Sequence, residues 1–263
     1  MLAVAVCLLG LAPASARADW LLYLSGSLGM ASGTTSIAGS SVLVNPTPPG
    51  RVFGGTYSDS SPLISGAFGV AIPLNETTAW ELPYDIRLPT WTLRFETDVT
   101  GLRSFEGLTN GPTLQDRNFG QTETWSMVFN LWQDVPLGGV TRLLAKLPGR
   151  TPRWVRQTLD KSQIYVGGGI GVAGIEIDFT DNTHFAQANN TQFAWQAGTG
   201  FSYALTRIVS LDLGYRYFDY GAVSTRYVGI GTGVDLGFFA LTQTSHEFRG
   251  GLRVNFWGFR PWR

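Results

Sequence analysis

The most constraining feature of this sequence is a pair of long alternating runs between Phe193 and Tyr220. In each run, most of the alternate positions are apolar, and the positions between them are mainly small or polar. The two runs are separated by a short connection at 206–208. The apolar set consists of Phe193, Trp195, Ala197, Thr199, Phe201, Tyr203, Leu205, Val209, Leu211, Leu213, Tyr215 and Tyr217. Alternation with a period of two around a tight turn predicts a long antiparallel hairpin.

The length and the polarity of this hairpin favour a membrane barrel over a soluble sandwich. Each run is about eleven residues long, whereas strands of soluble proteins usually have five or six residues. The set opposite the apolar one contains the ionisable residues Asp212 and Arg216 in the middle of a strand. Long strands with an apolar face that ends in aromatic residues are typical of a barrel wall in a bilayer.

The composition agrees with this interpretation. Only 14% of the 263 residues are charged, against about 25% in soluble domains, and the chain contains 33 glycines. Lys and Arg together number 19, as do Asp and Glu, so no net positive charge favours nucleic-acid binding. After the first residues, no apolar run approaches the ~18 residues of a transmembrane helix. These properties predict an all-β protein of the outer-membrane type.

Residues 1–18 have the pattern of a secretory signal peptide, with an apolar stretch followed by small residues and cleavage expected between Ala18 and Asp19. The sole cysteine, Cys7, would then be removed, which excludes disulfides and thiol chemistry in the mature chain. Lipidation of Cys7 is an alternative, although Val6 is larger than the residue that usually precedes a lipidated cysteine.

Eight segments of the chain alternate in this way, which predicts an eight-stranded antiparallel up-and-down barrel over residues 19–263. The predicted strands are 20–30, 63–74, 90–103, 121–135, 164–177, 193–205, 209–220 and 244–256. Long polar outer loops are predicted at 31–62, 104–120, 178–192 and 221–243. An even number of strands places both termini on the periplasmic side and these four loops outside the cell.

The segment 136–163 is the least barrel-like, and we interpret it as a basic periplasmic insertion. Six of its residues are Lys or Arg, and Asp160 is its single acid. Its apolar residues are compatible with one or two short amphipathic helices, broken at Pro148 and Pro152. Such a segment either contacts anionic lipid or the cell-wall polymer, or is an ordinary solvated connection.

The alternation predicts which charged residues face the barrel interior. These are Arg94, Glu96, Asp98, Asp212, Arg216, Glu247, Arg249 and Arg253. They comprise four acids and four bases, and we call them the lumen network. The interior of an eight-stranded barrel is only just wide enough for side chains, and buried charges must be paired. The balance therefore predicts a plug held by salt bridges rather than a conducting pore.

Gly169, Gly171 and Gly174 match the G-x-G-x-x-G pattern of dinucleotide sites. That pattern requires glycines between a strand and a helix, whereas these lie within a predicted strand. We therefore expect no cofactor. These glycines either make room for bulky inward neighbours such as Trp132 or permit sharp curvature of the wall.

Four stretches of the sequence resemble the Opa-like outer-membrane β-barrel domain, which is close in architecture to the small OmpA- and OmpX-type barrels. The stretches are SMVFNLWQDV, IYVGGGIGVAGIEI, FAWQAGTGFSYALTRIVSLDLGYRYFDYG and HEFRGGLRVNF. The resemblance implies a multi-pass protein of the Gram-negative outer membrane. Members of that family include adhesins, immune-evasion proteins and envelope-stabilising proteins.

The last predicted strand also resembles the C-terminal signal that the barrel-assembly machinery reads. The residues that carry this resemblance are Phe248, Leu252, Val254 and Phe256. Such signals usually end the chain, whereas here residues 257–263 follow. Either this tail is tolerated, or Trp257 or Phe259 takes the terminal role.

The sequence provides little for an enzyme, because His184 and His246 are its only histidines. Ser245 and Glu247 flank His246, but adjacent strand residues point to opposite faces. The His-x-Ser pattern of lipid A deacylase-like barrels is absent, and we expect no catalytic or metal site. We predict a monomeric structural or surface-interaction protein, active in adhesion or envelope integrity. Its expected partners are outer-membrane lipid, lipopolysaccharide, the assembly machinery and an extracellular or host ligand. The alternatives are a lipid-modifying enzyme and a small-solute channel.

Overall fold

The computed structural model describes residues 20–41, 51–74, 91–110, 117–138, 152–180, 184–206, 208–231, 233 and 235–259. Within these ranges, no helix has both the length and the hydropathy needed to cross a membrane. The predicted signal peptide at 1–18 lies outside the described residues.

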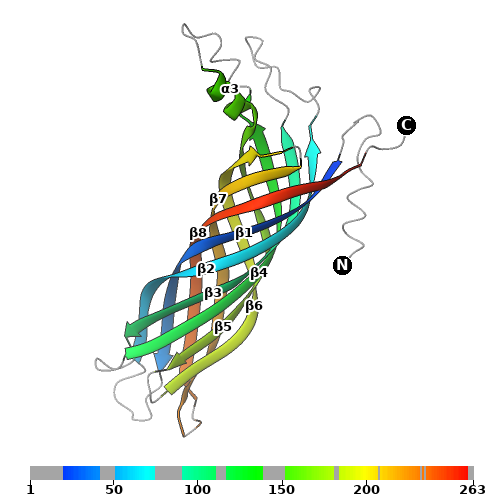
Figure 1. Ribbon diagram of the computed structural model, residues 1–263. Coiled ribbons are helices and arrows are strands. Elements are labelled where there is room, and N and C mark those ends of the chain that lie inside the picture. The colour runs from blue at the N-terminus through cyan, green and yellow to red at the C-terminus, as the bar shows by residue number, and fades with distance from the viewer. Residues whose placement is uncertain are drawn as a thin grey trace, which may run out of the picture.

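The chain forms one closed barrel in which eight strands follow one another in sequence order (Figure 1). The strands are β1 (Trp20–Ser41), β2 (Arg51–Pro73), β3 (Thr92–Asn110), β4 (Arg117–Pro136), β5 (Ser162–Thr180), β6 (His184–Ala204), β7 (Val209–Gly229) and β8 (Asp235–Phe259). All neighbours are antiparallel, and β1 closes the ring against β8. A short helix, α3 (Arg153–Asp160), lies between β4 and β5. The prediction of an eight-stranded up-and-down barrel is confirmed.

The strands are strongly tilted with respect to the barrel axis (Figure 1). The strand register that starts at Leu24 of β1, followed once around the barrel, returns to β1 at Thr34, ten residues farther along. A barrel with this stagger and only eight strands is narrow, so its interior is filled by side chains.

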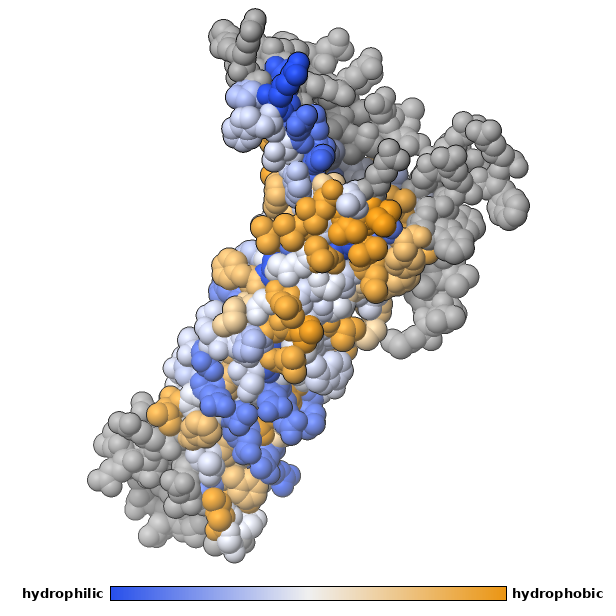
Figure 2. All heavy atoms as spheres, viewed as in Figure 1, coloured by the Kyte–Doolittle hydropathy of each residue, from blue (hydrophilic) through white to orange (hydrophobic). Residues whose placement is uncertain are grey.

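The part of the barrel nearer to α3 has an apolar exterior. Leu24, Phe68, Phe129 and Ile170 are each half-exposed or more, whereas Val128 beside Phe129 is fully buried. Figure 2 shows apolar side chains gathered over this part of the wall. We call this outward apolar surface the belt. The outward direction of the apolar set in the 193–220 hairpin agrees with the sequence prediction, since Phe193 and Trp195 contribute to the belt.

The strands are much longer than a bilayer requires, and this corrects the predicted loops. They contain 19 to 25 residues, whereas about 9–11 residues span the hydrocarbon core. Most of the described residues in the segments predicted as loops, 31–62, 104–120, 178–192 and 221–243, belong to strands. β1 and β2, for example, remain paired as far as Ser41 and Arg51.

These extensions form what we call the outer half of the barrel, at the end opposite α3. It comprises 31–41, 51–62, 104–110, 117–124, 173–180, 184–192, 218–229 and 235–245. Its exposed residues include Ser32, Ser58, Ser60, Glu106, Glu123, Glu176, Asp178, Gln187, Asn189, Thr191, Ser224, Arg226 and Thr242. Figure 2 shows many polar side chains over the visible face of this part, with some apolar ones near its end. Leu108, Phe119 and Phe238 are exposed large apolar residues of the outer half. The loop prediction was wrong because an outward set of Ser and Thr lacks the apolar alternation that marked the other strands.

The interior of the outer half is a hydrophobic core. Its members include Ile37, Tyr57, Phe105, Ile175, Ile177, Phe179, Phe218, Tyr220, Val223, Phe239 and Leu241. The Phe179 ring lies between those of Tyr57 and Phe239, with centroid distances of 6.3 and 5.0 Å. The barrel is therefore polar inside within the belt, and apolar inside beyond it.

Candidate functional site

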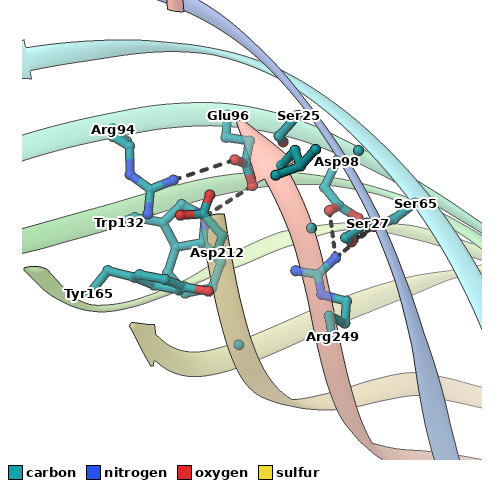
Figure 3. Close-up of a pocket in the computed structure, with 14 residues that line it drawn as sticks. Ser25, Ser27, Ser65, Arg94, Glu96, Asp98, Trp132, Tyr165, Asp212 and Arg249 are labelled. Atoms are coloured by element: carbon teal, nitrogen blue, oxygen red, sulfur yellow. Dashed lines mark hydrogen bonds and ion pairs between the residues drawn. The ribbon is translucent and has the colours of Figure 1, made fainter. Parts of the chain in front are cut away.

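The lumen network occupies the interior of the belt region, and the structure brings all eight of its predicted members together there. Six of them, Arg94, Glu96, Asp98, Arg216, Glu247 and Arg253, are buried. Asp212 and Arg249 are partly buried and line a cavity in the lumen (Figure 3). Strands β3, β7 and β8 supply these eight residues.

One group of ion pairs centres on Arg216, which bridges two carboxylates. Its Nη1 lies 3.2 Å from Asp98 Oδ1, and its Nε donates to Glu247 Oε2. The other oxygen of Asp98 accepts from Arg249 Nη1 at 2.8 Å (Figure 3). Arg216 also donates to Gln196 Oε1 at 2.7 Å. Four strands, β3, β6, β7 and β8, are thereby tied across the lumen.

A second group lies nearer to the α3 end. Arg94 Nε is 2.8 Å from Asp134 Oδ2, and Arg94 Nη1 is 3.8 Å from Glu96 Oε2. Arg253 contacts Asp134 at 3.8 Å and Asp212 at 3.4 Å. Each arginine in this group thus faces two carboxylates.

Neutral donors complete the surroundings of Glu96. Trp132 Nε1 and Asn130 Nδ2 donate to its Oε1 at 3.0 and 3.2 Å, and the Tyr23 hydroxyl donates to its Oε2 at 3.0 Å. A buried carboxylate with this many donors is compensated for its loss of water. The polar interior is therefore a connected network and not a set of isolated pairs.

The sequence prediction missed Arg103, whose Nε lies 3.0 Å from Glu247 Oε1 in a fully buried position. Strict alternation from Asp98 would turn residue 103 towards lipid. The register with β4 shifts between Thr100 and Arg103, where Leu102 adopts a φ of 61° and is 72% exposed. This β-bulge inserts an extra residue and returns Arg103 to the interior.

Asp134 was also missed, although it falls on the inward set of β4 together with Asn130 and Trp132. It was overlooked because only charged residues in the middle of the predicted strands were assigned to the lumen, and Asp134 lies near the end of the strand predicted at 121–135. With Arg103 and Asp134 included, the described lumen contains five acids and five arginines, so the charge balance is preserved.

The lumen leaves little free space. A cavity of about 50 Å³ lies among Ser25, Ser27, Ser65, Tyr165 and Arg249 (Figure 3). A water molecule needs about 10–15 Å³ on this measure, so the cavity accommodates only a few waters. The hydrophobic core of the outer half follows on one side of the charged region. Two layers of packed side chains therefore fill the barrel along its axis.

No family model matches the sequence, and no curated protein sequence matches it. Solved structures are similar to it. Neisserial surface protein A is 15% identical, with 89% of this chain and 97% of that chain covered and a TM-score of 0.39. The outer membrane protein OprG from Pseudomonas aeruginosa is 10% identical, with 91% of this chain and 97% of that chain covered and a TM-score of 0.42. Ail of Yersinia pestis is 11% identical, with 87% of this chain and 98% of that chain covered and a TM-score of 0.31.

This chain's own register and exposure pattern establish the architecture. In a closed β-barrel, every strand is paired on both sides, so the backbone N–H and C=O groups are hydrogen-bonded inside a bilayer. An apolar belt outside and a charged interior complete the pattern of a membrane barrel. The chain is an outer-membrane β-barrel protein. It crosses the membrane with all eight strands, as the small OmpA- and OmpX-type barrels do, and that prediction is confirmed at the level of the fold.

The two histidines of the barrel protein lie away from the lumen network. His246 is exposed on the wall, with its Nδ1 2.7 Å from the Tyr215 hydroxyl. Its neighbours Ser245 and Glu247 point inward, and Ser245 Oγ donates to Glu247 Oε1 at 3.1 Å. His184 begins β6 at the far end of the outer half. Ser245, His246 and Glu247 thus lie on opposite faces, as the alternation predicted.

Among the described residues, no group of three or more His, Cys, Asp or Glu side chains is arranged to hold a metal ion. The glycines of the G-x-G-x-x-G pattern lie within β5. A Cβ at Gly169 would lie 2.1 Å from Asn130 Oδ1, and one at Gly171 would lie 2.1 Å from Met127 O. Gly169 and Gly171 therefore allow close approach of β4, whereas the bulky inward Trp132 lies against Gly167, outside the pattern.

The four residues of the predicted assembly signal, Phe248, Leu252, Val254 and Phe256, all contribute exposed side chains to the belt. β8 continues beyond them to Phe259, whose backbone pairs with Trp20. The strand that would carry the signal is therefore also the strand that closes the barrel. Recognition by the assembly machinery remains a prediction.

Proposed function

We propose that this barrel protein is a surface-interaction protein. Its belt anchors it in the membrane, and its outer half presents a polar wall and connections to a partner outside the cell. The observation that carries the proposal is the continuation of all eight strands beyond the belt, where the exterior of the wall is mainly polar.

The outer half is built to remain ordered in water. Its interior is packed with apolar side chains, while hydroxyl groups on its exterior face each other across strands. Thr34 Oγ1 lies 3.2 Å from Ser58 Oγ, and Ser36 Oγ lies 3.3 Å from Thr56 Oγ1. A membrane anchor alone does not need this structure. A rigid stalk that holds a binding surface above lipopolysaccharide does.

The filled lumen supports an interaction role over a channel. A solute would have to displace both the ion pairs around Arg216 and the core around Phe179. Breaking a buried ion pair costs several kcal/mol.

A trimmed barrel tests the proposal. Thr35 and Tyr57 are register partners, so residues 36–56 can be replaced by Asn-Gly, which forms a two-residue hairpin turn. Ile177 and Ala188 allow the same replacement of 178–187. The readouts are adhesion of cells to matrix-coated surfaces and detergent sensitivity of the envelope, in a deletion strain that carries each version.

The proposal expects the trimmed protein to show heat-modifiable gel mobility, as a folded barrel does, while failing to restore the adhesion or envelope phenotype. Full restoration by the trimmed protein would contradict it. Stepwise conductance of the purified barrel in planar bilayers would identify a channel instead. A change in lipid A mass that depends on His246 would identify a lipid-modifying enzyme.

A further inference from the structure

Six of the eight residues of helix α3 are exposed, and Val155 and Leu159 are partly buried. None of its residues is buried, and Trp154 is 70% exposed. It is joined to the barrel at its C-terminal end, where Ser162 Oγ donates to the carbonyl of Thr158 at 2.7 Å. A helix of eight residues is marginal in water without tertiary packing, because nucleation is costly and few hydrogen bonds follow it. An additional surface that covers one side would stabilise it.

The sequence of α3 divides its surface into two faces. At 100° per residue, Trp154, Val155, Thr158 and Leu159 lie on one side of the helix. Arg153, Arg156, Gln157 and Asp160 lie on the other. A short helix with a large apolar aromatic residue on one face and arginines on the opposite face suits the interface of a bilayer.

The position of α3 places this helix at the edge of the belt. β5 begins at Ser162, two residues after α3 ends, and its outward Ile164 and Val166 are 45% and 53% exposed. Figure 1 shows α3 at the barrel end where β1 begins and β8 ends. Because the proposed function places the outer half outside the cell, the barrel end that carries α3 lies at the periplasmic leaflet.

The charge of the connection identifies the kind of surface. Arg153, Arg156 and Lys161 lie close to Asp160 in the sequence, and the segment 136–163 contains six bases against this one acid. Basic residues close to a membrane surface are attracted to anionic headgroups, and tryptophan prefers the headgroup level. We propose that α3 docks its Trp154 face on anionic phospholipid of the periplasmic leaflet.

Single-cysteine labelling tests this proposal, because Cys7 is the only native cysteine. In a Cys7→Ser background, Thr158→Cys places an environment-sensitive fluorophore on the apolar face, and Gln157→Cys places it on the polar face one residue away. The barrel is reconstituted in phosphatidylcholine vesicles with or without 30% phosphatidylglycerol. Brominated lipid then reports contact with the bilayer, and heat-modifiable mobility confirms folding of each variant.

We expect quenching at position 158 to exceed that at 157 by about threefold or more in the anionic vesicles. Arg153→Gln with Arg156→Gln should remove most of the effect of phosphatidylglycerol. Equal and weak quenching at both positions would overturn the proposal and indicate a solvated connection. Quenching that does not depend on phosphatidylglycerol would overturn the role of anionic lipid. Protection of position 158 only after addition of isolated cell-wall sacculi would assign the helix to that polymer instead.

Discussion

Replacement of Arg216 by methionine is the most informative perturbation of the lumen. The change removes a guanidinium that is 1% exposed and contacts both Asp98 and Glu247. Removing one partner of a buried ion pair typically costs about 3–5 kcal/mol, because the remaining charge has no water. Asp98 keeps Arg249 and Glu247 keeps Arg103, which limits the loss. We therefore expect the free energy of unfolding to fall by about 3 kcal/mol, at the lower end of that range.

The free energy of unfolding can be measured by guanidinium titration of the barrel in detergent micelles, with tryptophan fluorescence and gel mobility as independent probes. Arg153→Met on the exposed α3 is the matched control, and its effect should stay within about 0.5 kcal/mol. A double-mutant cycle of Arg216→Met with Glu247→Gln should show a coupling of about 0.5–3 kcal/mol. A loss below 1 kcal/mol for Arg216→Met, with no coupling, would refute the idea that ion pairs organise the lumen.

Three further predictions concern the bulge, the outer core and the glycines of β5. Deletion of Leu102 removes the extra residue of the bulge, so Gly101 alone should face Trp125 while Arg103 stays opposite Thr124 on the inward face. Heat-modifiable mobility should therefore be retained, and its loss would contradict the assigned register. Phe179→Ala should lower the free energy of unfolding by about 3–5 kcal/mol without preventing membrane insertion, as measured by denaturant titration and cell fractionation. An effect below 1 kcal/mol would mean that the outer half lacks a packed core. Gly169→Ala should destabilise the barrel by about 1–3 kcal/mol because its Cβ meets Asn130 Oδ1, whereas Gly26→Ala, which meets no atom within 4 Å, should be neutral in the same titration.

The belt region of the fold was predictable from the sequence because each of its strands carries two signals at once. In the 193–220 hairpin the outward residues are apolar and the inward ones are small or charged, so the alternation identifies the strand, its faces and the membrane together. All eight residues of the lumen network were found in this way, since each lies on the inward set of a strongly alternating strand.

The outer half was not predictable by the same reasoning. There the outward positions carry residues such as Ser32 and Ser58, and the inward apolar residues are interrupted by glycines such as Gly33 and Gly107. That composition is also typical of loops. Arg103 was missed for a different reason. The local sequence does not indicate a bulge at Leu102, because this residue has a positive φ although it is not a glycine. Asp134 could have been found by continuing the alternation of β4 by one more step.

The central claim is that the wall changes character along each strand, from lipid-facing to water-facing on the outside. Three positions of β5 test it in a Cys7→Ser background: Val166→Cys in the belt, Glu176→Cys on the outside of the outer half, and Ile175→Cys in its core. The measurement is labelling of intact cells by a membrane-impermeant maleimide. We predict rapid labelling at 176 and protection at 166 and 175. Labelling at 166 as fast as at 176, or protection at 176, would contradict the account.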